Sequence, residues 1–336
     1  MTWLSLGSLA LPFQLQRQGV ALRSEIAQLG VELTTGQSSD PAQRLRGETG
    51  ALSALTSRVS RLEAFDQNAR MLSARAEVSQ SALGRANTAR ERVAAGMLAA
   101  AVVSADAASL TAAGTTARGA LQDVIQSLNQ RVGGQSLFAG AATDAIPLPD
   151  ASSMIAAVMP LVTGLDSADA VAAAVDAAFT APGGLFEPAL YQGAAAAPGA
   201  LLDTGAGSLD QPTAADPAIR GLLAALVTSA LTADPAMSLG LDQRRSLAQS
   251  GAESLLGNAS ALSALQGQVG EMQATLEGRL LQYQTEKDAL TTARQDLIGI
   301  DPYKAASRLE EARTQLETLY TVTARTARLS LAEYLR

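Results

Sequence analysis

Histidine and cysteine are absent from the 336 residues of this chain. Without them there is no thiol nucleophile, no Ser-His-Asp triad, no structural zinc of the Cys/His type and no haem held by an axial His. Asp and Glu are scattered along the sequence rather than gathered at metal-ligand spacing, and no convergent catalytic cluster is visible. We therefore expect no cofactor, no metal site and no enzymatic activity.

Bulky rings are also scarce, since aromatic residues make up 3% of a chain that is 47% hydrophobic. Ala and Leu dominate the apolar residues, and both head the helix-propensity ranking. This composition is typical of long, thin, Ala-rich helices rather than of a wide core. The length allows two or three domains.

Two further absences limit the partners. The net charge is -7, from 32 acidic and 25 basic residues, so nothing drives the chain as a whole toward nucleic acid. No run of 18 or more apolar residues occurs, which predicts no membrane span. The first cation is Arg17, which follows the N-terminal apolar stretch instead of preceding it, unlike the order in a cleavable signal peptide.

The first segment, residues 1–33, is expected to be an amphipathic helix that needs a partner. Its apolar residues recur at steps of three, four and seven, which place them on one stripe. A connecting loop over 34–43 should follow, with Gly36 at the helix end and Asp40-Pro41 as an N-cap with Pro at the first helical position. The stripe consists of Leu15, Leu22, Ile26, Leu29 and Leu33.

Residues 44–132 are expected to form N-terminal rod helices. The chain runs from Ala42 to about Val103 without proline and keeps a three-four apolar step, which predicts one long rod helix. A bend is expected near 104–106, followed by a second helix that ends at Gly133-Gly134.

The composition changes over residues 133–238, where most of the twelve prolines and several glycine clusters lie. This change predicts a separate outer insert. Short apolar pieces at 187–191 and 199–202 could be strands between turns, whereas 168–179 and 218–231 have helical patterns. We expect a small mixed α/β insert.

The remainder is helical again, as a C-terminal rod helix over 239–300 and a terminal amphipathic helix over 301–336, separated by a break at 299–302. The fold class is therefore mainly α, a long antiparallel helical rod or coiled-coil bundle of the two ends, with the insert in the middle. Arg244-Arg245 is expected on a solvated helix face. The terminal helix carries the apolar positions Leu309, Leu316, Leu319, Leu329, Leu331, Tyr334 and Leu335.

Several motifs resemble the bacterial flagellin superfamily, and within it the hook-associated proteins of the hook-filament junction. The segment from Leu29 to Ala42 resembles the family's loop after its innermost helix. The segment from Ala305 to Arg336, which closes with Ser330 to Leu335, resembles the family's terminal helix. The junction resemblance rests on 134–140, similar to a Gly-x-Tyr-x-Phe-Ala-Gly element, and on 191–193, identical to a Tyr-Gln-Gly element.

This resemblance implies a structural flagellar subunit that joins hook to filament by self-assembly into a helical ring. It also implies flagellin and another hook-associated protein as neighbours, an export chaperone and the flagellar type III export apparatus as earlier partners, and an extracellular location. The interface residues would be the terminal apolar positions given above. A flagellin that forms the filament itself is the first alternative, and a secreted helical effector that meets membranes is the second.

A lone helix with an apolar stripe is marginal in water, because nucleation is unfavourable and stability comes from burying one face. We therefore expect residues 1–33 and 301–336 to be poorly ordered in the isolated subunit. They should become helical when they pack on each other and on neighbouring subunits. An intramolecular bundle core is the simpler reading of the same stripes.

Overall fold

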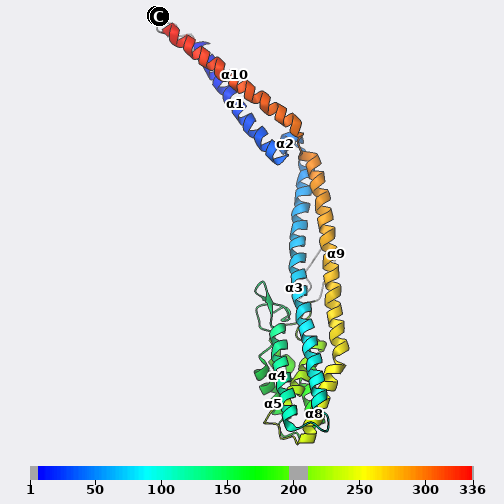
Figure 1. The fold of residues 1–336 in the computed structure, drawn as a ribbon. Helices are drawn as coiled ribbons and strands as arrows, with labels where there is room; N and C mark the ends of the chain where they lie inside the picture. The colour runs from blue at the N-terminus through cyan, green and yellow to red at the C-terminus, as the bar shows by residue number, and fades with distance from the viewer. Residues whose placement is uncertain (1–6, 197–210, 335–336) are drawn as a thin grey trace. The chain divides into compact units, whose positions relative to one another are not determined.

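The computed structural model describes residues 7–196 and 211–334, and these residues fold into two compact units. The first unit joins the two ends of the chain, Met1–Ala64 and Tyr283–Arg336, and the second is the continuous stretch Phe65–Gln282. The chain is 76% helical, which confirms the prediction of a mainly α protein. Figure 1 shows the helices in chain order.

The first unit contains α1 (Gly7–Thr35), the short α2 (Pro41–Arg44) and α10 (Pro302–Tyr334). It also contains the beginning of α3 (Gly50–Ala100) and the end of α9 (Ala259–Ile298). The chain ends α1 with Gly36 at φ +67°, a left-handed conformation that favours glycine. The packing of α1 against α10 confirms that the two ends of the chain meet (Figure 1).

Two ion pairs link α3 to α9 within the first unit. Arg58 on α3 pairs with Glu286, and Glu63 on α3 pairs with Lys287 at 3.1 Å. The charges have opposite order in the two pairs, so a shifted register would oppose like charges. Such exposed pairs add little stability but select one antiparallel alignment.

The second unit is built around α7 (Pro217–Leu231), in which every residue from Leu222 to Leu231 is buried. The helices α4 (Ala107–Leu128), α6 (Ala168–Thr180) and α8 (Leu241–Gly257) all pack against α7. The close approach of α8 to α7 depends on small residues. A Cβ on Gly251 of α8 would lie 2.6 Å from the Ser229 hydroxyl.

The remaining elements of this unit are short. The strands β1 (Arg131–Val132) and β2 (Gln135–Ser136) form an antiparallel hairpin whose turn has Gly133 and Gly134 at positive φ. The helix α5 (Ala151–Val162) and the π-helical turn η1 (Phe186–Leu190) complete the unit. Side-chain caps from Asp106, Asp150 and Ser167 start α4, α5 and α6.

The middle of the chain is more helical than expected. The helices expected at 168–179 and 218–231 are confirmed as α6 and α7. The piece at 187–191, expected as a strand, instead lies mostly in η1, because Phe186 and Leu190 turn inward to the core. The second strand, 199–202, lies outside the described residues.

Two helix boundaries also differ from the expectation. The N-terminal rod helix starts at Gly50, not near Ala42, because residues 45–49 turn with Arg46 and Gly47 at positive φ. The C-terminal rod is two helices, α8 and α9, separated at Asn258, whose Nδ2 donates to the Ala218 carbonyl at 3.0 Å. The bend expected at 104–106 is confirmed between α3 and α4.

Candidate assembly interface

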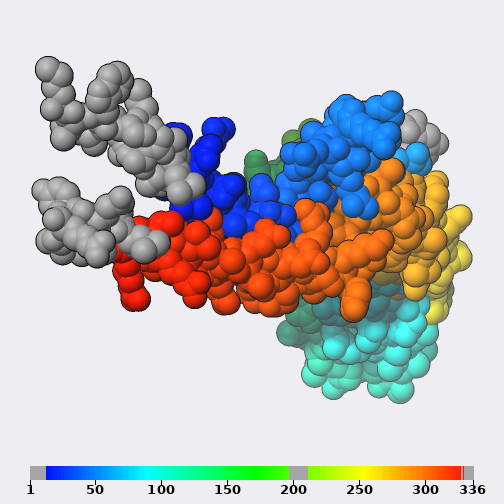
Figure 2. All heavy atoms as spheres, turned by 90° about the horizontal axis from the view of Figure 1, so that it is seen from above, coloured from blue at the N-terminus to red at the C-terminus, as the bar shows by residue number. Residues whose placement is uncertain are grey.

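The candidate interface is the pair formed by α1 and α10. In the space-filling view the atoms of α1 lie against those of α10 (Figure 2). Small residues permit this approach: Gly19 is buried, and a Cβ there would lie 3.2 Å from Leu319 Cδ2. Leu29, Ala305 and Ala312 are 3%, 6% and 3% exposed. The seam is therefore narrow and largely built from small side chains.

Polar contacts fix the alignment of the two helices. The Arg23 Nε donates to the Tyr320 hydroxyl at 3.0 Å, and its guanidinium carbon lies 5.7 Å from the centre of the Tyr320 ring. Arg308 pairs with Glu25 at 3.1 Å. An exposed cation–π contact contributes ~0.5–1 kcal/mol, so these contacts set register more than they hold the pair together.

The predicted stripe residues are placed on this pair, but few of them are covered. Leu29 is buried, whereas Leu15, Leu22, Ile26, Leu33, Leu309, Leu316 and Leu319 are only partly buried. The helix α10 includes positions 329, 331 and 334, but the side chains of Leu329, Leu331 and Tyr334 are outside the described set, as is the whole of Leu335. Their part in an interface stays a prediction.

The structure adds large residues that the stripe omitted. Phe13 is 67% exposed, Val20 59% and Val31 53% on α1, while Tyr303 and Val322 on α10 are 82% and 42% exposed. Single exposed apolar residues are ordinary. Here they lie on both helices of a pair whose inner seam is narrow, so the pair has apolar surface left to cover.

A joint ties the base of this pair together, between residues 36–44 and 294–300. The Ser38 amide donates to the Ile298 carbonyl at 2.8 Å, and the Ile300 amide donates to the Gly36 carbonyl at 3.1 Å. Gln37 and Gly299 thereby form an antiparallel bridge. The two chain ends are thus joined at one point by main-chain hydrogen bonds.

Side chains reinforce the joint from both sides. Gln295 Nε2 donates to the Gly36 carbonyl at 3.0 Å, and an Arg294 nitrogen donates to Gln37 Oε1 at 3.2 Å. Arg44 Nε donates to the Leu297 carbonyl at 3.0 Å, which satisfies a carbonyl of the last turn of α9. Periodicity along the sequence could not reveal these contacts, because their partners are more than 250 residues apart.

The two family-like motifs of the second unit interlock, although 53 residues separate Phe138 from Tyr191. The Tyr191 hydroxyl donates to the Ala194 carbonyl at 2.8 Å and lies 3.5 Å from the Phe138 carbonyl. The Ala194 amide donates to the Ala139 carbonyl at 2.9 Å. A Cβ on Gly140, which has φ +61°, would lie 2.3 Å from the Ala194 carbonyl oxygen. Gly140 is therefore required by the close approach of the two backbones.

The ring of Phe138 is fully buried, which favours the role of a core anchor for this residue. Phe179, Phe186 and Tyr191 gather beside one another, with ring centroids 5.7 and 6.1 Å apart. Burial raises the pKa of Tyr191 and also that of Asp216. These shifts follow from packing.

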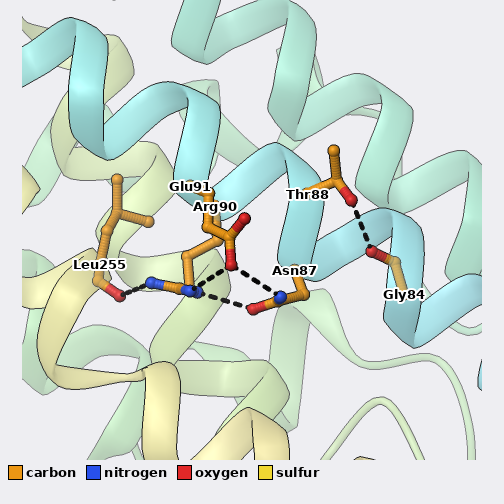
Figure 3. A network of polar contacts seen from close by, with 6 residues as sticks. All are labelled: Gly84, Asn87, Thr88, Arg90, Glu91 and Leu255. Atoms are coloured by element: carbon orange, nitrogen blue, oxygen red, sulfur yellow. Dashed lines mark hydrogen bonds and ion pairs between the residues drawn. The ribbon is translucent and has the colours of Figure 1, made fainter.

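Buried arginines in the second unit bind carbonyls at the ends of neighbouring helices. Arg90 on α3 is 5% exposed and donates to the Leu255 carbonyl of α8 at 3.2 Å, as Figure 3 shows. Its other nitrogens donate to Asn87 Oδ1 and Glu91 Oε1 at 3.0 and 3.1 Å. A cation at a helix C-terminus is favourable. The end of α8 is therefore fixed by a side chain of another helix.

Arg244 and Arg245 do not lie on a solvated face, contrary to the sequence-based expectation. Arg244 Nε donates to the Thr232 carbonyl at 2.9 Å, just after α7, and Arg245 donates to the Ala105 carbonyl before α4. Arg244 and Arg245 are partly buried, whereas Arg75 is 9% exposed. Arg75 donates to Gln135 Oε1 at 2.8 Å and to Gln211 Oε1 at 3.1 Å, and burial lowers its pKa. Guanidinium groups suit this task because they offer several donors in fixed geometry.

Within residues 7–196 and 211–334, no group of three or more acidic side chains is placed to hold a metal ion. A hollow lies between α3 and α4, with Arg85, Arg92, Asp123 and Gln130 on its walls. It is an open, polar groove rather than an enclosed site. In that same part of the chain, every helix is too short or too polar to cross a bilayer.

Comparison with known proteins finds a family match in the C-terminal part of the chain. Residues 256–335 match the family model of the bacterial flagellin C-terminal helical region. A solved structure of a protein from Vibrio parahaemolyticus, described as a flagellar hook-associated protein, aligns over 75% of this chain and 98% of its own. That alignment has 13% identity and a TM-score of 0.42. No curated protein matches the chain.

Proposed function

We propose, from its flagellin-like C-terminal region over residues 256–335, that this chain is the structural subunit at the junction of hook and filament. A structural role in the flagellum follows from the family of that region. The position of the subunit at the junction of hook and filament is the more specific part of the proposal. The proposed role includes no catalytic step, no cofactor and no metal.

The apolar surface left on the α1–α10 pair carries the proposal. Phe13, Val20 and Val31 on α1 and Tyr303 on α10 are each more than half exposed. Covering them with equivalent helices of neighbouring copies would remove apolar area from water, which contributes about 25 cal/mol per Å². Head-to-tail contacts of this kind extend into helical assemblies. The pair therefore suits a subunit of an axial tube.

The interlocked motifs support the junction over the filament itself. The resemblance to junction proteins rests on 134–140 and 191–193. These two stretches lie together in the second unit, where Ala194, which directly follows the second stretch, donates its amide to the Ala139 carbonyl of the first. The two stretches therefore share one structural task. The alternative, a filament flagellin, is favoured by the matched family model, which describes flagellins.

The remaining assignments follow from the same family. We infer flagellin and a second hook-associated protein as neighbours on the two sides of a helical ring. Before assembly, an export chaperone and the flagellar type III export apparatus would handle the chain, which would end outside the cell. The absence of cysteine is compatible with a chain exported unfolded.

Deletion of residues 330–336 in the native organism tests the proposal. A junction subunit should then leave hooks without filaments and release flagellin into the medium. Normal filaments would contradict it.

Assays on the purified full-length protein separate the alternatives. A filament flagellin should grow long filaments from seeds, a junction protein should stay short, and a membrane effector should bind liposomes and lose that binding with its last helix.

A further inference from the structure

Two arginines on α3 line the groove between α3 and α4. Arg85 and Arg92 are both exposed and lie seven residues apart, so they share one face of the helix at a spacing of about 10.5 Å along its axis. Arg85 donates to Ser81 Oγ at 3.3 Å and to Gln130 Oε1 at 2.9 Å, and both acceptors are neutral. A carboxylate from a partner would be a stronger acceptor for this cation than either of them.

The groove has space for such a partner. Its volume is about 610 Å³, and short buried side chains such as Ala89 and Ser127 lie among its lining residues. A Cβ on Gly84, which also lines the groove, would meet no atom within 4 Å. Packing within the subunit therefore does not require a glycine there, although glycine weakens a helix relative to alanine. Figure 3 shows Gly84 and Thr88 on the side of α3 away from the Leu255 carbonyl, so the groove is separate from the contact with α8.

The opposite wall of the groove competes only weakly for the arginines. Asp123 on α4 approaches Arg92 at 3.7 Å, and their side chains are 69% and 57% exposed. A long, exposed ion pair of this kind contributes little to stability. Arg92 can therefore exchange Asp123 for a better placed carboxylate.

The helix α6 carries two carboxylates at the same spacing. Asp169 and Asp176 are exposed and seven residues apart, with the exposed Ala173 between them. In the described part of the chain, the side-chain contact of this pair is a hydrogen bond from the Thr180 hydroxyl to Asp176 at 3.3 Å rather than an ion pair. Residues 163–180 contain three acidic residues and no basic one. The outer face of α6 is therefore acidic and narrow, while its inner face packs against α7 and α8.

Two other acidic pairs with this spacing occur in the described helices. They are Glu25 with Glu32 on α1 and Glu310 with Glu317 on α10. In each of these pairs one carboxylate already has an arginine partner within 3.1 Å. The pair on α6 is therefore the better match for the groove.

We propose that α6 of a second copy of this chain docks in the α3–α4 groove, with Asp169 and Asp176 on Arg85 and Arg92. Each guanidinium can bind a carboxylate through two parallel N–H groups, and matched charges at equal spacing fix the register of the two surfaces. The groove and the acidic face lie on different helices, so each copy offers α6 to one neighbour and receives α6 from another. Such a head-to-tail contact extends into a ring or helix instead of closing as a dimer.

This inference deepens the proposed function, because it names a contact between copies that lies outside the terminal helices. It rests on the proposed function only for the premise that copies of the chain meet. The two can fail separately. The contact is measured between purified copies, whereas the junction role is judged by the filaments that remain after deletion of residues 330–336.

Disulfide crosslinking tests the contact directly, because the natural chain contains no cysteine. When the charges pair, Thr88 lies opposite Ala172 if the two helices run parallel and opposite Ala173 if they run antiparallel. Full-length Thr88→Cys protein is mixed with Ala172→Cys or Ala173→Cys protein and oxidised. One of these mixtures should give roughly fivefold more mixed dimer than the same mixture with Ser260→Cys, an exposed position on α9. Equal yields in all three mixtures would overturn the proposal.

Charge reversal then tests whether the ion pairs carry the contact. Arg85→Glu with Arg92→Glu in the Thr88→Cys copy should lower the yield roughly fivefold, since like charges then face each other. Asp169→Arg with Asp176→Arg in the other copy should restore it. Absence of rescue, with the helical circular dichroism of both copies unchanged, would contradict the pairing.

A milder set of variants decides the question if a reversed copy loses helical content. Asp169→Asn with Asp176→Asn removes the carboxylates without adding charge, and the crosslinking yield should fall. Asp123→Asn removes the competing carboxylate from the groove, and the yield should rise. An unchanged yield in the first variant would overturn the proposal, and a lower yield in the second would contradict the role given to Asp123.

Discussion

Leu29 and Val31 lie two residues apart on α1 but in different surroundings, and this contrast separates folding from assembly. Leu29 is 3% exposed, whereas Val31 is 53% exposed. Leu29→Ala removes buried methyl groups and leaves a cavity, which costs ~2–5 kcal/mol. Val31→Ala removes atoms that already face solvent, so it should change monomer stability by less than ~0.5 kcal/mol.

Val31 should matter for assembly even though it matters little for the stability of the monomer. If a neighbouring copy covers Val31, the two lost methylene equivalents are worth ~1–2 kcal/mol. That raises the critical concentration roughly 5- to 30-fold, since 1.4 kcal/mol is about tenfold. Hydrogen exchange measures the first effect and sedimentation of seeded assemblies the second. An unchanged critical concentration for Val31→Ala, or a monomer as destabilised as Leu29→Ala, would refute the reasoning.

Three further predictions concern the second unit. In urea unfolding, Gly140→Ala should destabilise the second unit by more than Gly134→Ala. Both glycines have positive φ, which costs an alanine ~1–2 kcal/mol, but of the two only Gly140 has carbonyl oxygens where the Cβ would lie. Equal losses of stability would exclude the clash. Arg90→Lys should lower the stability of the second unit by ~1–3 kcal/mol, because it leaves buried hydrogen-bonding groups unpaired. Arg92→Lys, at an exposed position, should lower it little. Equal shifts of the melting temperature would count against a stabilising role for Arg90 at the end of α8. Hydrogen bonds from Ser152 and Ser153 lower the pKa of Asp150 to about 2, so its stabilising effect should be present above about pH 4 and fade toward pH 2; an NMR titration with a midpoint near 4 would contradict this.

Local signals were sufficient for much of the fold. The three-four spacing of apolar residues predicted the long helices, and Gly36 and Asp40-Pro41 predicted the break after the first one, because these signals act within a few residues. They failed at 187–191, where inward packing of Phe186 and Leu190 produced a π-helical turn. Local spacing does not show which core a short apolar piece joins.

The candidate interface was predictable only in outline. The stripe on α1 identified Leu29, but not the seam at Gly19, because a glycine gives no apolar signal. The joint and the arginine caps depend on partners far along the chain, such as Arg90 with the Leu255 carbonyl. A charged residue on a helix has the same sequence pattern whether its partner is water or a buried carbonyl.

The fastening in the second unit also concentrates two attachments on one short stretch of backbone. The Ala194 amide donates to the Ala139 carbonyl and the Ala214 amide donates to the Phe138 carbonyl, so two parts of the chain that are 20 residues apart are held by neighbouring residues. A displacement of the backbone at Phe138 and Ala139 would therefore release both attachments together.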